Sequence, residues 1–285
     1  MRFVCFSQDG SSLFGIVKND IVHGFPESVA TLGAYLALDP NGRDALPTHA
    51  IGPISEVALG PPVHPHKNVF CVGRNYMGHA EEIARARGTE LRLPSVPTFF
   101  TKAPTAIVGP DATIHLSGTL SSEYDYEAEL AVVIGTRCRD VSERDALGVV
   151  FGYTCLNDVT ARDLQKEHQQ WFKGKSLDET CPVGPWIVSA DEIGDPGSLD
   201  IAMRIDGVTK QSSNTAHMIF NVAQIIASLS AGLTLEPGDT IATGTPDGVG
   251  FARTPPEFLR DGTRMEVEIA KIGILRTTVA LSPAR

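Results

Sequence analysis

The sequence predicts a mainly β, α+β protein, and three observations support this class. The chain has 285 residues, of which 42% are hydrophobic, so it can bury an extensive core. Its apolar segments are short, are bounded by turns rich in glycine and proline, and in places alternate with polar residues as strands do. The few helix-like segments do not alternate regularly with these strands, which argues against a doubly wound sheet of βαβ units.

The first sixty residues are expected to form a separate group of elements. β-like segments cover 2–7, 13–19 and 20–25. A short helix is expected over 28–38. The segment LGPPVHPHKN that follows contains three prolines and interrupts regular structure. We therefore predict a small N-terminal domain over 1–62 and a larger domain over 63–285.

The larger domain is expected to be rich in strands. Strands are predicted over 68–73, 97–102, 128–135, 147–158 and within 235–250, and hairpins over 203–211 and 264–281. The segment 128–135 is apolar without interruption, as in a strand that is covered on both faces. Helices are predicted over 79–88, where Gly88 would cap the C-terminus, and over 216–233, where apolar residues recur at helical spacing.

Composition and charge exclude several classes of protein. The net charge of −10 and the lack of a basic tract argue against a nucleic-acid or membrane-surface partner. No segment has the apolar length of a secretion signal or a membrane span. The five cysteines are scattered and never in C-x-x-C spacing, which is typical of a reducing cytosol. The sequence therefore predicts a cytoplasmic protein with neither of these partners.

A row of acidic residues leads into the apolar strand at 128–135. Glu123, Asp125, Glu127 and Glu129 occupy every second position, so in an extended chain their side chains share one face. Like charges repel, and burying them without compensation costs several kcal/mol or more. A solvated sheet edge is one explanation of the pattern. Glu123 and Asp125 lie further from the apolar segment. They are expected to be solvated, or to contact the residues that form a site without binding its ligand themselves.

A metal site is the second explanation of these carboxylates. Glu127 and Glu129 adjoin the buried strand, so solvent alone is a poor partner for them, and Asp158 directly follows another apolar segment. Three carboxylates from two strand ends provide the oxygen ligands that Mg²⁺ or Mn²⁺ prefers. A bound cation would also supply the charge that makes the cluster tolerable. We therefore predict a Mg²⁺ (or Mn²⁺) site at Glu127, Glu129 and Asp158.

Five ordered segments are similar to one known family. They cover 72–82, 125–135, 152–165, 172–188 and 235–250. In order and spacing they resemble the fumarylacetoacetate hydrolase family, whereas the first sixty residues match it weakly. The resemblance implies a mixed β-sandwich roll with a small N-terminal α+β domain, and a homodimer.

The resemblance also implies roles for individual residues. Glu127, Glu129 and Asp158 correspond to the metal ligands of the family, in agreement with the strand geometry. The implied catalytic residues are His79, Glu82 and Lys175. The implied substrate-binding residues are Arg74, Tyr76, Arg162, Gln165 and Thr245.

Without the resemblance, several of these residues have a plainer explanation. His79 and Glu82 are one helical turn apart and could form an ordinary exposed pair. If they instead hydrogen-bond in a site, the carboxylate would orient the imidazole and raise its basicity. Lys175, two residues after Lys173, could be a solvated loop lysine.

The activity implied by the resemblance is hydrolysis of a C–C bond in a 2,4-dioxo acid of acylpyruvate or fumarylpyruvate type, through an enolate held by the metal. His79, oriented by Glu82, would activate water, Lys175 would help to hold the enolate charge, and the helix at 77–87 would act as a lid. The same groups would also serve an isomerase, tautomerase or decarboxylase acting on hydroxymuconate-type or oxaloacetate-type 2-oxo diacids. A further alternative is a non-catalytic, metal-dependent oxo-acid binding protein, and the intact His79–Glu82 pair argues against it.

Overall fold

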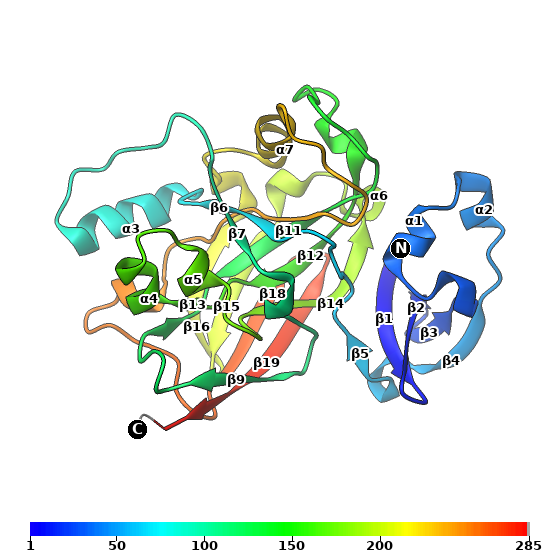
Figure 1. Cartoon of the computed structure of the whole chain (residues 1–285), viewed down its shortest axis with the longest axis horizontal. Coiled ribbons are helices and arrows are strands. Elements are labelled where there is room, and N and C mark those ends of the chain that lie inside the picture. Colours follow the sequence, from blue (N-terminus) through cyan, green and yellow to red (C-terminus); the bar gives the residue numbers. More distant parts are fainter. Residues whose placement is uncertain (284–285) are drawn as a thin grey trace.

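Two β-sheets pack face to face in the computed structural model, which describes residues 1–283 (Figure 1). The larger is a mixed 12-stranded sheet and the smaller has five strands. The main core lies between them and is built from alternate side chains of both sheets, including Val132, Tyr153, Met203, Val267 and Leu275. The predicted mainly β, α+β sandwich is therefore confirmed.

The larger sheet contains strands from the whole length of the chain. In spatial order it comprises β4 (His49–Pro53), β3 (Ile21–Gly24), β2 (Ser11–Lys18), β1 (Arg2–Gln8), β14 (Cys181–Ser189), β12 (Val150–Asn157), β11 (Ala128–Ile134), β17 (Thr240–Ala242), β6 (Val69–Gly73) and β7 (Thr98–Lys102). Two short strands, β5 (Leu59–Gly60) and β8 (Ile107–Val108), pair with β1 and β14. All pairs along this order are antiparallel except β17 with β6.

The smaller sheet is formed by later strands. Its order is β16 (Val208–Asn214), β15 (Asp200–Ile205), β18 (Arg264–Ile269), β19 (Gly273–Ser282) and β9 (Thr113–Ser117). A separate two-stranded ladder joins β10 (Tyr124–Asp125) to β13 (Thr160–Ala161).

Seven α-helices occur among the described residues. They are α1 (Leu32–Leu36), α2 (Pro40–Asp44), α3 (Met77–Arg87), α4 (Arg162–Glu167), α5 (Phe172–Lys175), α6 (Ala190–Ile193) and α7 (Val222–Ser230). Single 3₁₀ turns cover Glu27–Val29, Ile54–Glu56, Pro104–Ala106, Ala146–Val149, Pro196–Ser198, Thr215–His217 and η7 (Gly250–Ala252). Figure 1 places α3, α4 and α5 at the end of the molecule that lies away from β1–β4. None of the helices in the described part of the chain has the length and apolar composition needed to cross a bilayer.

The N-terminal strands are joined to the larger sheet by a short stretch of pairing. Phe3 of β1 lies opposite Ile187 of β14, and Arg2 lies opposite Val188. On one face of this junction, the ring centroids of Phe3 and Phe151 lie 4.8 Å apart, as part of an aromatic cluster.

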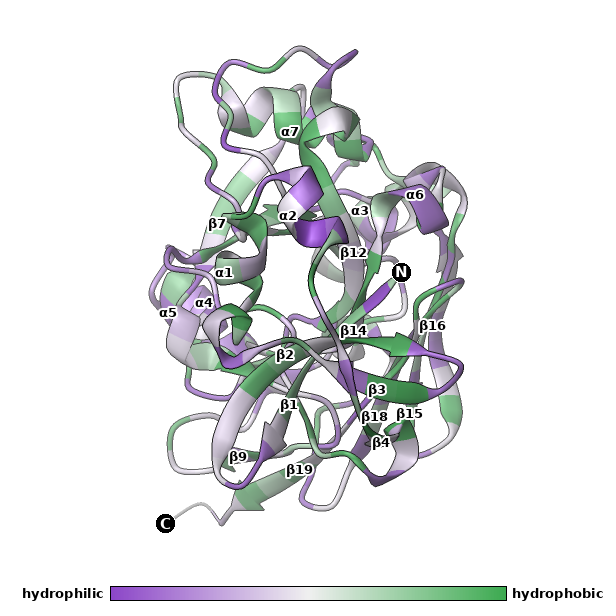
Figure 2. Cartoon of the chain, turned by 90° about the vertical axis from the view of Figure 1, so that its right-hand side faces the viewer, coloured by the Kyte–Doolittle hydropathy of each residue, from purple (hydrophilic) through white to green (hydrophobic). Residues whose placement is uncertain are grey.

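Strands β2, β3 and β12 are largely hydrophobic, whereas α2 is hydrophilic (Figure 2). The division of the chain near residue 62 stays a prediction.

Several predicted elements have the expected position. The strand at 128–135 is β11, and each of its residues is buried. The D-G hairpin at 203–211 is the β15–β16 turn. Gly88 caps α3 with φ of +63°, which favours glycine.

The helix predicted over 216–233 is shorter than expected, because α7 covers only Val222–Ser230. Asn221 starts this helix with a capping box: its side chain accepts a hydrogen bond from the Gln224 amide, and Gln224 reciprocates. The residues before it form a 3₁₀ turn and an extended segment. The helix predicted over 28–38 likewise covers only Leu32–Leu36, after Thr31 caps its N-terminus.

Candidate active site

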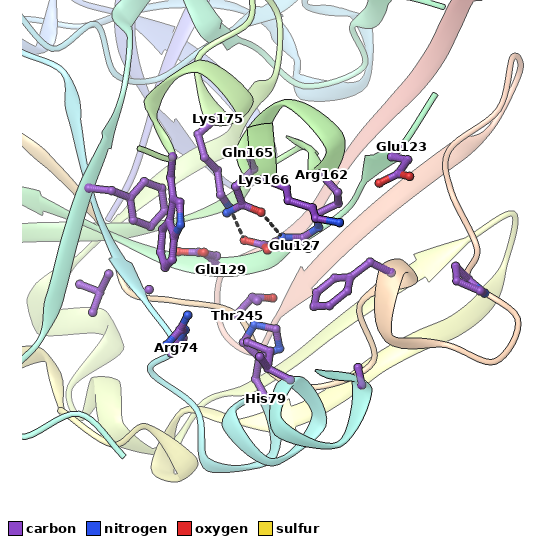
Figure 3. Close-up of a pocket in the computed structure, with 18 of the residues that line it drawn as sticks. Arg74, His79, Glu123, Glu127, Glu129, Arg162, Gln165, Lys166, Lys175 and Thr245 are labelled. Carbon is purple, nitrogen blue, oxygen red and sulfur yellow. Dashed lines mark hydrogen bonds and ion pairs between the residues drawn. The ribbon is translucent and has the colours of Figure 1, made fainter. Parts of the chain in front are cut away.

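A cavity of about 700 Å³ opens between α3 on one side and α4 and α5 on the other (Figure 3). This volume is typical of small-molecule binding sites. Its charged and polar lining consists of Arg74, His79, Glu123, Glu127, Glu129, Arg162, Gln165, Lys166, Gln169, Lys175 and Thr245. The remaining lining is largely apolar or aromatic: Val72, Gly73, Ile83, Ala86, Phe100, Trp171, Phe251, Pro256 and Phe258.

Three buried carboxylates converge beside this cavity. Each of Glu127, Glu129 and Asp158 contributes an oxygen, and these oxygens lie within 4.8 Å of one another. The start of β11 and the end of β12 bring them together, because the Glu127 amide donates to Asn157 Oδ1 at 3.0 Å and the Asp158 amide donates to the Glu127 carbonyl at 2.9 Å. The trio predicted from strand spacing is thus assembled in the structure.

Two of the three carboxylates are already paired with cations of the protein. Lys175 Nζ lies 2.7 Å from Glu127 Oε2 and 2.6 Å from Asp158 Oδ2. Arg162 Nη2 lies 2.7 Å from Glu127 Oε1, and Lys102 Nζ lies 2.7 Å from Asp158 Oδ1. Protein cations therefore supply part of the charge that makes the cluster tolerable, in addition to any that a bound metal ion would supply. Lys102 was missed because a lysine that ends an apolar strand carries no local signal of its partner.

These ion pairs shift the pKa values in the site. Burial would raise the pKa of Glu127, but Lys175 and Arg162 outweigh it and lower the pKa to about 2. Burial would lower the pKa of Lys175, yet Asp158 and Glu127 raise it. Lys175 is 1% exposed, so the explanation of a solvated loop lysine is excluded.

Glu129 differs from the other two carboxylates. It accepts a hydrogen bond from the Gly244 amide at 2.7 Å, and no ion pair to it occurs among the described residues. Burial, together with Asp158 and Glu127, raises its pKa well above the ordinary value. Nearby, the Tyr76 hydroxyl is buried without a hydrogen-bond partner in the described structure, and burial with the Glu129 charge raises its pKa.

The residues present fit a hard divalent cation. The donor set consists of oxygens alone, as Mg²⁺ and Mn²⁺ prefer. Glu129 is a buried carboxyl group without an ion pair among the described residues, and an unpartnered hydroxyl lies in the same region.

His79 and Glu82 form a buried pair on α3. Their exposed fractions are 5% and 9%, which excludes an ordinary surface pair. His79 Nδ1 lies 3.2 Å from Glu82 Oε2, and Glu82 Oε1 accepts a hydrogen bond from the Gly248 amide at 2.9 Å. With a proton on Nδ1 donated to Glu82, Nε2 is the nitrogen left to accept a proton. Figure 3 shows His79 on one side of the carboxylates and Lys175 and Arg162 on the opposite side.

Comparison with known proteins assigns the chain to a family. The model of the C-terminal domain of fumarylacetoacetate (FAA) hydrolase matches residues 68–280. The chain belongs to this family. It is accordingly an enzyme of the fumarylacetoacetate hydrolase family, and the resemblance of its five motifs is confirmed.

Three similar proteins illustrate the range of this family. Oxaloacetate tautomerase YisK of Bacillus subtilis (strain 168) is 46% identical over 227 residues, which are 79% of this chain and 74% of that protein. The 2,4-didehydro-3-deoxy-L-rhamnonate hydrolase of Sphingomonas sp. (strain SKA58) is 39% identical over 283 residues, 98% of this chain and 96% of that protein. The structure of a fumarylacetoacetate hydrolase (EaFAH) from psychrophilic Exiguobacterium antarcticum has a TM-score of 0.85 and 40% identity, and the match covers 99% of this chain and 100% of that one.

Four of the five predicted substrate-binding residues of this fumarylacetoacetate hydrolase family enzyme line the cavity. They are Arg74, Arg162, Gln165 and Thr245. Tyr76 is buried and does not contribute to the cavity wall.

Thr245 is held by a residue that sequence reasoning missed. Gln211 Nε2 donates to Thr245 Oγ1 at 2.8 Å, while Gln211 Oε1 accepts from the Ala128 amide at 2.9 Å. The Thr245 hydroxyl therefore keeps its own proton to donate toward the cavity. Gln211 lies on β16, far from any motif, and had no signal in the sequence.

Aromatic side chains support the cations of the site in this fumarylacetoacetate hydrolase family enzyme. The Phe100 ring lies 5.0 Å from Lys175 Nζ, and the Phe251 ring lies 4.5 Å from the Arg162 guanidinium carbon. Trp171 packs edge-on against Phe100 at 5.2 Å. Such residues resemble core formers in the sequence, so their position in a site could not be predicted.

Asp125 and Glu123 have different environments. Glu123 is partly exposed and lines the cavity. Asp125 has no exposed surface, so it is not solvated, and it pairs with Arg162. The strand is interrupted at residues 126–127, between β10 and β11, and the acidic row is therefore not one continuous face.

Proposed function

We propose that this chain is a divalent-metal-dependent hydrolase that cleaves a C–C bond in a 2,4-dioxo acid of acylpyruvate or fumarylpyruvate type. The observation that carries the proposal is that His79 lies across the cavity from Glu127, Glu129 and Lys175 (Figure 3). Glu82 pairs with His79, and Asp158 completes the carboxylate trio. A base on one side and an anion-stabilising centre on the other suit a reaction that passes through an enolate.

The first task of the site is to hold the 2-oxo acid. Glu127, Glu129 and Asp158 would hold a divalent cation. When bound, this cation supplies Lewis-acid polarisation of the 2-oxo group. Arg162 and Thr245 lie in the cavity wall with donors suited to the substrate carboxylate.

The second task is proton transfer by His79. Glu82 accepts a hydrogen bond from His79 Nδ1, so His79 Nε2 would take a proton from a water molecule. The oxygen of this water attacks carbon 4 of the substrate. The tetrahedral adduct then breaks the bond between carbons 3 and 4, and its electron pair moves into the enolate of the 2-oxo fragment. Protonation of carbon 3 gives pyruvate or a related 2-oxo acid, and the other fragment leaves as a carboxylic acid.

Lys175 would balance the negative charge of the enolate. Its ammonium group is buried between Glu127 and Asp158, and the direction of its pKa keeps it charged. A fixed charge in a site shielded from water stabilises a developing anion without reorganisation.

The apolar part of the cavity lining supports hydrolysis over reactions of a four-carbon diacid. Besides the charged residues, the wall includes Ile83, Ala86 and Phe258, which would accommodate an acyl substituent on carbon 4. The full-length similarity to a hydrolase of a 2,4-didehydro-3-deoxy acid also supports this assignment.

The second candidate is tautomerisation or isomerisation of a 2-oxo diacid. It is supported by the 46% identity to an oxaloacetate tautomerase. In this reaction His79 would move a proton between carbon 3 and the 2-oxo oxygen, and no bond to carbon 4 would break. Decarboxylation of an oxaloacetate-type acid would use the same enolate. A non-catalytic binding protein has no use for a base that is buried with its orienting carboxylate.

An isotope experiment separates these reactions. The protein is incubated with Mg²⁺ or Mn²⁺ in H₂¹⁸O with acetylpyruvate, the enol of oxaloacetate or a hydroxymuconate, and products are identified by mass spectrometry. Hydrolysis places ¹⁸O in the released carboxylic acid of acetylpyruvate. Loss of enol absorbance without cleavage indicates a tautomerase, and release of CO₂ indicates a decarboxylase. Oxalate binding without turnover of any substrate would refute the enzymatic proposal.

A further inference from the structure

Asp125 is a fully buried carboxylate with every acceptor position in use. Its Oδ1 accepts hydrogen bonds from the backbone amides of Tyr126 at 2.8 Å and Gly250 at 2.7 Å. Its Oδ2 accepts the amide of Phe251 at 3.1 Å and Arg162 Nε at 2.9 Å, and Arg162 Nη2 lies 2.8 Å away. A buried charge is tolerated only with such partners. Asp125 therefore fixes two things together, the Arg162 side chain and the start of η7.

On one side, Asp125 sets the plane of the Arg162 guanidinium. Nε and Nη2 face Asp125, Nη2 also reaches Glu127, and Nη1 donates to Gln165 at 3.3 Å. The Phe251 ring covers the guanidinium at 4.5 Å. One Nη1 hydrogen then remains for a ligand in the cavity. The orientation of this donor depends on Asp125 and on the loop that carries Phe251.

On the other side, the same loop is bound by helix α3. The Gly248 amide donates to Glu82 Oε1, and Glu82 Oε2 contacts His79. Two residues later, an added Cβ on Gly250 would lie 1.9 Å from the Glu257 carbonyl oxygen and 2.6 Å from Asp125 Oδ1. The approach therefore requires glycine. The loop at 248–251 is thus bound by α3 at Gly248 and by Asp125 at Gly250 and Phe251. The Gly248 carbonyl also accepts hydrogen bonds from the Tyr126 hydroxyl at 3.1 Å and from Arg253 Nη2 at 3.3 Å.

We propose that Asp125 is a positioning residue that couples closure of α3 to the orientation of Arg162. With Glu82 on Gly248, the loop presents the amides of Gly250 and Phe251 to Asp125, and Asp125 holds Arg162 toward the cavity. When α3 moves away, the loop loses the Glu82 contact, which weakens its hold on Asp125 and so on Arg162. This inference rests on the proposed function only in placing the substrate in the cavity beneath α3, which would act as its lid.

The coupling is tested without turnover, by hydrogen–deuterium exchange of the α3 amides. The variants are Asp125→Asn, Glu82→Gln and the double variant, with Asp163→Asn as matched control. Asp163 lies beside Arg162 on α4 but binds Ser121 Oγ at 2.6 Å instead of the loop. Both single variants are expected to speed exchange of α3 at least about fivefold, and the double variant no more than the faster single one, because coupled changes do not add. The control should match the wild type.

A second measurement, of oxalate affinity, tests the orientation of Arg162. Calorimetry with Mn²⁺ and oxalate should show that Asp125→Asn weakens oxalate binding about tenfold while the Mn²⁺ affinity changes little. Arg162→Lys is the fallback where Asp125→Asn does not fold, because it disturbs the same contact more mildly and should also speed α3 exchange.

The proposal is overturned if the α3 amides of the folded variants exchange at the wild-type rate, or if the effects of the two substitutions add in the double variant. It is also overturned if the exchange rate rises equally throughout β11 and β12. An enzyme that proves inactive on every oxo acid would refute the proposed function, whereas the exchange measurements would still test the coupling.

Discussion

Lys102 Nζ lies 2.7 Å from Asp158 Oδ1, and neither side chain has any exposed surface. The lysine also donates to the Val159 carbonyl at 3.1 Å and to the Lys175 carbonyl. It therefore joins the end of β7 to the segment that follows β12 and to α5. A charge pair buried this deeply is costly to break, because the partner that is left has no access to water.

We expect Lys102→Met to destabilise the metal-free protein by about 3 kcal/mol, since Asp158 would lose a buried cation. Denaturant unfolding at pH 7 in the presence of EDTA measures the change. The matched control is Lys173→Met, an exposed lysine, which should stay within about 0.5 kcal/mol of the wild type. Equal stability of the two variants would show that Lys102 contributes no net charge compensation.

Two of the three carboxylates should respond differently to neutralisation. Glu129→Gln removes a buried carboxyl group whose pKa is raised in the folded state, so the metal-free protein should become more stable at pH 7. Glu127→Gln leaves Lys175 and Arg162 without their shared partner and should lower the stability. Thermal unfolding in EDTA measures both effects.

The same two variants should lose affinity for Mn²⁺, because each removes a ligand. Calorimetric titration of the stripped proteins checks this expectation. Retention of wild-type Mn²⁺ affinity by both would contradict the metal site.

The stability of the metal-free protein should depend on pH through Glu129. Its pKa in the folded state is raised well above the ordinary 4.5, so the folded protein holds this proton more tightly than the unfolded chain. The contribution of this proton to the free energy of unfolding is complete below about pH 4.5. It is lost as the pH rises through the pKa of Glu129 in the folded state. Glu127, with a pKa lowered to about 2, acts in the opposite sense and only below that window.

Unfolding free energies of the wild type and Glu129→Gln, measured in EDTA from pH 5 upward, isolate this contribution. The wild type should lose stability relative to the variant as the pH rises. A constant difference between the two proteins would contradict the raised pKa.

Replacement of His79 should separate chemistry from metal binding. His79→Ala removes the proposed base, so kcat on an acylpyruvate should fall about 10²- to 10⁴-fold. The Mn²⁺ affinity should change little, because the imidazole is not among the three converging ligands. His66→Ala, at an exposed position, is the control and should keep full activity. A His79→Ala variant with most of its activity would refute the role of the base.

The sequence predicted the parts of the fold that depend on neighbouring residues. The unbroken apolar run of β11, the Gly88 cap and the D-G turn before β16 each follow from the local chemistry of a few residues. The helix at 216–233 was too long in the prediction because an apolar periodicity does not mark where capping starts, and Asn221 decides this.

The candidate site was predicted in part. Glu127 directly precedes β11, Glu129 lies in it and Asp158 directly follows β12, so their convergence follows from pairing of these adjacent strands. The pairing of His79 with Glu82 could be predicted from helical spacing. Their burial could not, because it depends on the contact of Glu82 with the distant Gly248.

By itself, the sequence thus determined many of the strands, though not β4, β9 or β14. It also determined where three carboxylates meet and to which family the motifs are similar. Only the tertiary structure decided that Lys102 neutralises Asp158, that Gln211 holds Thr245, and that Asp125 faces Arg162 instead of solvent. The physical reason is that a buried charge or amide takes its partner from whichever segment the packed core brings within hydrogen-bond distance. That choice is made by long-range packing and has no signature in the adjacent sequence.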